Sequence, residues 1–190
     1  MDIDTEISSF LTTGDYPCVA ALASLHRNEF KIGAYDRLGS PAFVSQMAKD
    51  LFAFSQQQIQ TKQTYLSFWA VFPDHGDEML DEEAFDRLLW RHLSLLASAP
   101  EYNFAWDPKF SDNPLDRNFC FSFAGRAMFV VGLHRGSSRI ARRFKYPALI
   151  FNVFDQFNDL MRQNRYQPMV DTIRARDTRL QGTVNPMSEQ

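Results

Sequence analysis

The chain has 190 residues, of which 45% are hydrophobic and 18 are phenylalanines, so a single domain can bury a sizeable core. Its formal net charge of −3 argues against a general nucleic-acid binder, and no apolar run approaches the roughly 20 residues needed to span a bilayer. The two cysteines and the acidic, polar start of the chain favour a reducing cytoplasm over a secreted, disulfide-bonded protein. We therefore expect one cytoplasmic domain over residues 1–190.

Apolar periodicity predicts the elements of the first half of the chain. Alternating side chains indicate one strand, and a nearly continuous apolar run closed by Pro73 favours a second, buried strand. Ser40 as N-cap and Pro41 at the first helical position predict the start of a helix. The expected elements are a helix or loose end at 1–10, a strand at 30–35, a helix from Ser40 to the glutamines at 56–58, a strand at 65–72 and a helix at 82–97.

The second half combines turns, a predicted β-hairpin and further helices. Residues 100–118 are rich in proline and asparagine turns. Beyond them we expect a hairpin at about 119–133 with its turn at 124–126, a strand at 147–152, and helices at 155–163 and 168–180. The fold class expected is α+β, a small antiparallel or mixed sheet with a central hairpin (about 119–133) packed by several helices.

His134 is the first candidate ligand. It stands at the end of an apolar strand, directly before Arg135 and Gly136. A histidine held at a rigid strand end, beside a glycine that allows close approach, suits ligation of a metal or of heme iron. Most histidines at strand ends are structural, so position alone does not decide between the two interpretations.

The remaining histidines offer one alternative ligand. His92 lies on the apolar face of the predicted helix at 82–97, where a core histidine satisfied by hydrogen bonds is the commoner outcome. His26 and His75 lie in polar turns and are expected to be exposed. The chain has no Gly-rich phosphate loop, no paired CxxC, no HExxH and no G-x-S-x-G elbow, so these common catalytic motifs are excluded.

Four arginines follow His134 at near-helical spacing, and a short helix would place them on roughly one side with Ile140 and Phe144 facing inward. Guanidinium groups hold carboxylates or phosphates through paired hydrogen bonds. A solvated basic face paired with acids is an equally good reading. An apolar hairpin, a histidine and cations for the propionates together favour heme. The turn contains Arg135, Arg139, Arg142 and Arg143, with Lys145 nearby and Ser137 or Ser138 as the predicted helix cap.

Short motifs follow one another in order from about Trp106 to Met187. They are Phe121-Ser122-Phe123, Gly125-Arg126, Phe129-Val130-Val131-Gly132-Leu133-His134, Ser137-Ser138-Arg139, Ala141-Arg142-Arg143-Phe144, Pro147-Ala148-Leu149, Phe151-Asn152, Gln156-Phe157, Ile173-Arg174, Arg176-Asp177, Leu180-Gln181-Gly182 and Asn185-Pro186-Met187. In these motifs the chain resembles the YqcI/YcgG family, which includes heme-dependent N-hydroxylases of the guanitoxin and D-cycloserine pathways. Tyr16-Pro17-Cys18 resembles the family's early Pro-Cys element more weakly.

The resemblance implies a b-type heme and oxidation of a guanidine or amino nitrogen of an arginine-like small molecule. It gives His134 the best claim to be the axial metal ligand, with His92 as the alternative. The expected cofactor-binding residues are His134, Ser138, Arg139, Arg142 and Arg143, and the expected substrate-binding residues are Asn152 and Asp177. The resemblance also suggests that this C-terminus is short relative to the family.

The leading hypothesis is a heme-dependent N-hydroxylase, an iron monooxygenase or peroxygenase that uses an electron donor with oxygen, or peroxide. The alternative is a non-catalytic heme- or small-ligand-binding sensor or carrier, because Arg135 and Phe154 stand where the resemblance places a proline and a histidine. An anion-binding module that uses the arginines is a third reading. Nucleic-acid and membrane partners are not expected, and homo-oligomerisation is left open.

Overall fold

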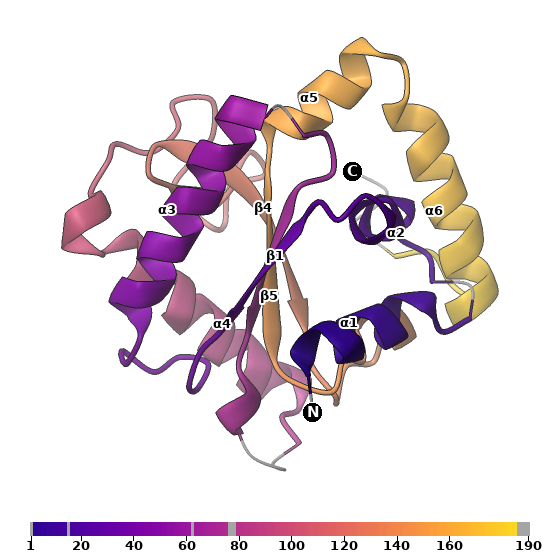
Figure 1. Cartoon of the computed structure of the whole chain (residues 1–190), viewed down its shortest axis with the longest axis horizontal. Helices are drawn as coiled ribbons and strands as arrows, with labels where there is room; N and C mark the ends of the chain where they lie inside the picture. The colour runs from indigo at the N-terminus through magenta and orange to yellow at the C-terminus, as the bar shows by residue number, and fades with distance from the viewer. Residues whose placement is uncertain (1, 15, 62, 76–78, 186–190) are drawn as a thin grey trace.

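The computed structural model describes residues 2–14, 16–61, 63–75 and 79–185. A five-stranded mixed sheet lies between two groups of helices (Figure 1). The strands are β1 (Phe30–Ala34), β2 (Ser67–Val71), β3 (Ser122–Phe123), β4 (Arg126–Leu133) and β5 (Ala148–Val153), in the order β1-β2-β5-β4-β3. The predicted α+β class is therefore confirmed.

The helices account for most of the remaining regular structure. Their bounds are α1 (Ile3–Thr12), α2 (Val19–His26), α3 (Val44–Thr61), α4 (Glu82–Ala97), α5 (Asp155–Arg162) and α6 (Tyr166–Gln181), with short 3-10 turns η1 (Pro73–His75), η2 (Pro100–Tyr102) and η3 (Ile140–Arg142). Within the described ranges, no helix combines the length and apolarity that a membrane span requires.

Strand pairing follows the connections along the chain. β1 and β2 are parallel, because α3 carries the chain from one to the other. β5 pairs antiparallel with β2 and β4, and β4 pairs antiparallel with β3 at the edge of the sheet. Every residue of β2 is buried, as its continuous apolar run predicts.

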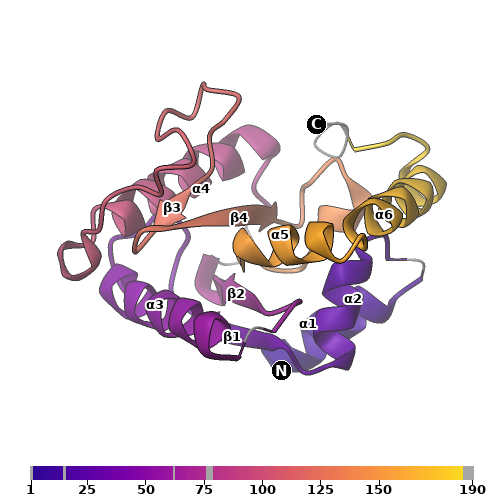
Figure 2. The ribbon, with the colours of Figure 1, turned by 90° about the horizontal axis from the view of Figure 1, so that it is seen from above.

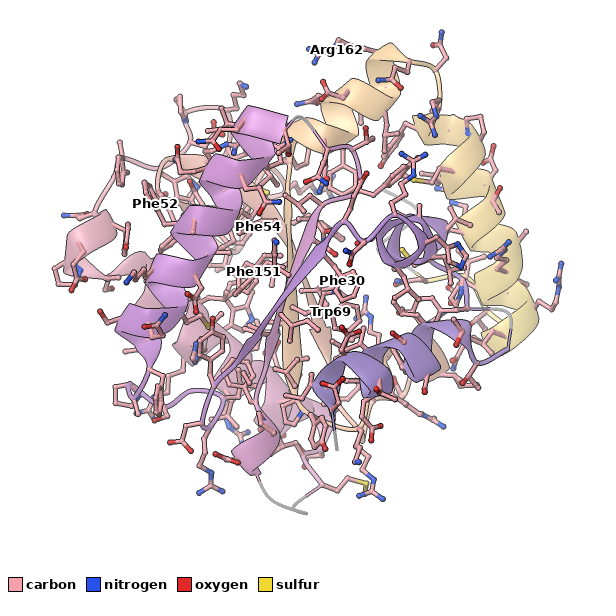
Figure 3. The ribbon with its side chains drawn as sticks, in the orientation of Figure 1. Phe30, Phe52, Phe54, Trp69, Phe151 and Arg162 are labelled. Atoms are coloured by element: carbon pink, nitrogen blue, oxygen red, sulfur yellow. The ribbon has the colours of Figure 1, made fainter. Side chains whose placement is uncertain are left out.

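The first face of the sheet packs on α3 and α4. Figure 3 shows Phe54 of α3 and Phe151 of β5 on this side, where their side chains belong to one core cluster. Helix α3 contributes an apolar stripe at helical spacing, as predicted. The same core takes Phe85, Leu93 and Leu96 from α4.

The second face carries the other four helices. Figure 3 shows Phe30 and Trp69 on this side, opposite Phe54 and Phe151. Here Trp69, Val71 and Ile150 pack with Ile7 and Leu11 of α1. Seen from above, α1 and α2 lie beside β1, whereas α5 and α6 lie beside β4 (Figure 2). The two halves of this face are therefore covered by different helices.

Several local predictions are wrong for identifiable reasons. Helix α3 begins at Val44 rather than at Pro41, because Phe43 has a φ of 64°, which a helix does not tolerate. Strand β3 starts only at Ser122, and the hairpin turn consists of Ala124 and Gly125, both with positive φ. The pattern also fails to predict α2, whose N-cap is the thiol of Cys18.

Candidate functional site

His134 lies where β4 ends, with only 4% of its surface exposed. Its Nδ1 is 3.2 Å from the carbonyl oxygen of Leu80, and its ring stacks on Phe85 with the centroids 4.3 Å apart. A carbonyl oxygen only accepts, so Nδ1 carries the hydrogen and Nε2 is the basic nitrogen. Burial lowers the pKa of His134 below its usual value, which keeps the ring neutral at pH 7. A neutral imidazole whose other nitrogen is fixed by a carbonyl is the form that binds metals.

The turn after His134 is tied to the start of α4. The Glu82 carboxylate accepts hydrogen bonds from the Ser138 amide at 2.9 Å and from its hydroxyl at 2.7 Å, and these bonds lower the pKa of Glu82. Gly136 packs so closely that a Cβ atom there would lie 2.2 Å from the Leu80 oxygen. The space that glycine provides is therefore used by the backbone of this chain. Neither Ser137 nor Ser138 caps η3, contrary to the prediction.

The predicted arginines have different partners. Arg139 donates to Asp177 at 2.5 Å in a largely buried ion pair, and also to carbonyl oxygens near the C-terminus. Arg143 donates to the Ser137 carbonyl at 2.7 Å, so it holds the turn itself. Arg135 is exposed. Phe144 is buried as expected, but Ile140 is 40% exposed because η3 is a single 3-10 turn rather than a helix with an inward face.

Arg142 differs from the other arginines of the turn. Its side chain is half-buried, and its guanidinium donates no hydrogen bond to any residue that the structure describes. Burial first, and the neighbouring Arg139 second, lower the pKa of Arg142 below its usual value. A desolvated cation of this kind is stabilised by an anion. Arg142 is thus the arginine of this turn best placed to bind an anion from outside the chain.

Tyr16 joins this region, although it is not among the predicted site residues. Its hydroxyl donates to the Ala141 carbonyl at 3.2 Å, and Arg176 donates to the Tyr16 carbonyl at 3.3 Å. Burial raises the pKa of the Tyr16 phenol. The only sequence signal was the weak match of Tyr16-Pro17-Cys18 to the family's Pro-Cys element. The fold brings this element to η3.

The alternative ligand, His92, is held on both sides. The Gly39 amide donates to its Nδ1 at 3.1 Å, so Nε2 carries the hydrogen and points to the Met47 sulfur at 3.1 Å. Burial lowers its pKa to about 4. These contacts are those of a satisfied core histidine. His26 is exposed as expected, but His75 is buried, because η1 turns it inward.

The expected substrate-binding residues lie on different elements. Asn152 of β5 pairs with Phe129 of β4 and is half-buried on the second face of the sheet. Asp177 of α6 is only 5% exposed and forms the ion pair with Arg139. The structure therefore joins Asp177 to the arginine turn and leaves Asn152 farther along the sheet.

Within the described residues, no group of three or more histidine, cysteine, aspartate or glutamate side chains is arranged to hold a metal ion. Both cysteines are free thiols. Neither the comparison with curated proteins nor that with solved structures found a significant match. A model of the YqcI/YcgG family matches residues 7–190, which is nearly the whole length. The chain therefore belongs to the YqcI/YcgG family.

Proposed function

We propose that the protein binds a b-type heme through His134 and hydroxylates a nitrogen of a small guanidine or amino-acid compound. The observation that supports this proposal most directly is the hydrogen bond from Nδ1 of His134 to the Leu80 carbonyl. This hydrogen bond leaves Nε2 of a neutral ring as the nitrogen that can bind a metal. Of the two candidate histidines, only His134 has this arrangement.

The donor set fits heme better than a bare metal ion. A protein site for Zn²⁺ needs three or four ligands, whereas heme iron takes four from the macrocycle and often one from the protein. Phe85 covers one face of the His134 ring, but a metal bonds in the ring plane at Nε2, so the stacking fixes the ring without blocking the donor. When bound, heme supplies an iron that activates oxygen, with an electron donor, or peroxide.

The chain's own residues would hold the His134 ring in place and bind the carboxylate of a propionate or substrate. The Leu80 carbonyl and Phe85 hold the His134 ring, and Glu82 holds the turn that follows. Arg142 is the cation available for a propionate or a substrate carboxylate, because Arg139 is neutralised by Asp177.

Absorption spectroscopy tests the proposal. The purified protein titrated with hemin should give a Soret band at a one-to-one ratio, and the reduced form should respond to carbon monoxide. His134→Ala should abolish stoichiometric binding, whereas His26→Ala, at an exposed histidine, should leave it unchanged. His92→Ala should lower stability while preserving the spectrum of the folded fraction. A wild-type protein without a Soret band would refute the proposal, and a band retained by His134→Ala would refute the ligand.

A non-catalytic heme- or ligand-binding role is the second candidate. It is favoured because the buried Asp177 carboxylate, expected to contact substrate, is committed to Arg139. Product analysis with arginine and either peroxide or a reductant separates the two functions. Sustained formation of an N-hydroxylated product excludes a pure binder, and heme binding without product favours it.

A further inference from the structure

Helix α6 stands outside both hydrophobic cores. The buried Asp177 pairs with Arg139, and this fixes which side of α6 faces the protein. Ile173 and Val170 are one and two helical turns before Asp177 and share this side. Both are only half-buried, and neither belongs to the two core clusters of the described residues. The inward side of α6 is therefore apolar but incompletely covered.

The sheet shows a matching surface. On the second face of β4, Phe129 is 42% exposed and Val131 is half-buried, whereas Leu133 at the end of the strand is buried. Phe157 of α5 packs edge-on against Phe129, so α5 closes this surface at one end. Figure 2 shows α5 beside β4 and α6 next to α5, and α6 also packs against α2. We define the α6 face as Phe129, Val131, Val170 and Ile173.

The other end of this surface carries positive charge. Turn η3 packs against α6 and contains Arg142, whose guanidinium has no hydrogen-bond partner among the described residues. Arg139 nearby is neutralised by Asp177, so it does not compete for a second anion. A half-buried cation beside exposed apolar side chains is complementary to an apolar molecule that ends in an anion.

We propose that the α6 face binds a small organic carboxylate, with its carboxylate on Arg142 and its apolar body between Val131 and Ile173. The proposal does not depend on heme ligation by His134. The His134 ring packs on Phe85 in the core of the first face, but the His134 amide donates to the Arg142 carbonyl at 3.0 Å, so Arg142 is the residue that this site and the proposed heme site share.

Octanoate and 1-octanol are matched probes, because they share the chain and differ in charge. Calorimetric titration should show octanoate binding more tightly than octanol. Arg142→Gln should weaken octanoate about tenfold, the effect of one charge-assisted hydrogen bond, and leave octanol unchanged. Arg142→Lys should retain most of the octanoate affinity. Arg135→Gln, at an exposed arginine of the same turn, is the control and should bind both probes as the wild type does.

Ile173→Trp tests the apolar part, because a larger side chain there should weaken both probes. Octanoate binding that is insensitive to both Arg142→Gln and Ile173→Trp in folded variants would overturn the proposal, as would equal affinity of the wild type for the two probes. Competition with hemin separates this proposal from the heme proposal. If hemin displaces octanoate equally from wild type and from His134→Ala, the α6 face holds the hemin. This result would refute His134 as the heme ligand and would support the α6 face as a carboxylate site.

Discussion

The buried His92 should make stability depend on pH through its own titration. Its folded pKa is about 4, against an ordinary value of 6.5 in the unfolded chain. Above pH 6.5 the ring is neutral in both states and has no effect. As the pH falls from 6.5 towards 4, the unfolded chain takes up a proton that the folded protein refuses, so unfolding becomes easier. Below pH 4 both states are protonated and the dependence ends.

The size of the effect follows from the two pKa values. Between pH 7.5 and pH 4.5, His92 alone should remove about 2.5 kcal/mol from the free energy of unfolding. This is a large share of the roughly 5–15 kcal/mol that stabilises a typical domain. The cause is desolvation, because the ring is 1% exposed.

Urea unfolding of the wild type and of His92→Gln at pH 7.5 and 4.5 measures the contribution. Glutamine retains an acceptor and a donor but does not titrate, so the variant should lose about 2.5 kcal/mol less than the wild type over this interval. Carboxylates and the other histidines titrate in both proteins, and their contributions cancel in the difference. His26→Gln, at an exposed position, should follow the wild type. Equal losses in wild type and His92→Gln would refute the reasoning.

Two further predictions concern the arginine turn. Asp177→Asn leaves Arg139 largely buried without its counter-charge and should lower the free energy of unfolding by about 3–5 kcal/mol. The control is Glu83→Gln in the exposed pair with Arg87, which should cost less than about 1 kcal/mol. Similar losses for the two variants in denaturant titrations would contradict a buried role for the Asp177 pair. Gly136→Ala should lower stability by about 1–3 kcal/mol and displace the turn, because the new Cβ would overlap the Leu80 oxygen; an unchanged nitrogen NMR signal of the His134 ring would count against this packing.

Much of the fold could be predicted because apolar periodicity is a local signal. The run that forms β2 and the stripe that forms α4 predict those elements closely, since each must bury one side or both. The start of α3 could not be predicted, because Ser40 and Pro41 are ordinary start signals and the positive φ of Phe43 is imposed by the surrounding chain. Helix α2 lacks a clear polar side and a usual cap residue.

The candidate site was only partly accessible from the sequence. The position of His134 at a strand end was correct, and its hydrogen bond to Leu80 links residues that are 54 positions apart. No spacing rule within the turn predicts that partner. The four arginines share a pattern, but their roles are set by Asp177, by turn carbonyls and by burial. The shared spacing of these arginines therefore does not indicate which of them remains free to bind an anion.

Asp177 also explains why α6 is held beside the sheet without joining a core. A buried carboxylate on the inward side of α6, near its C-terminal end, needs a cation, and Arg139 supplies it from η3. This contact fixes α6 by charge at one end, so its apolar side chains need not interlock with those of β4. Ile173 is half-buried and belongs to neither core cluster, whereas the half-buried Val131 packs against the cluster of the second face. The same ion pair removes Arg139 as an anion site and leaves Arg142, so it shapes both the apolar surface and its charged end.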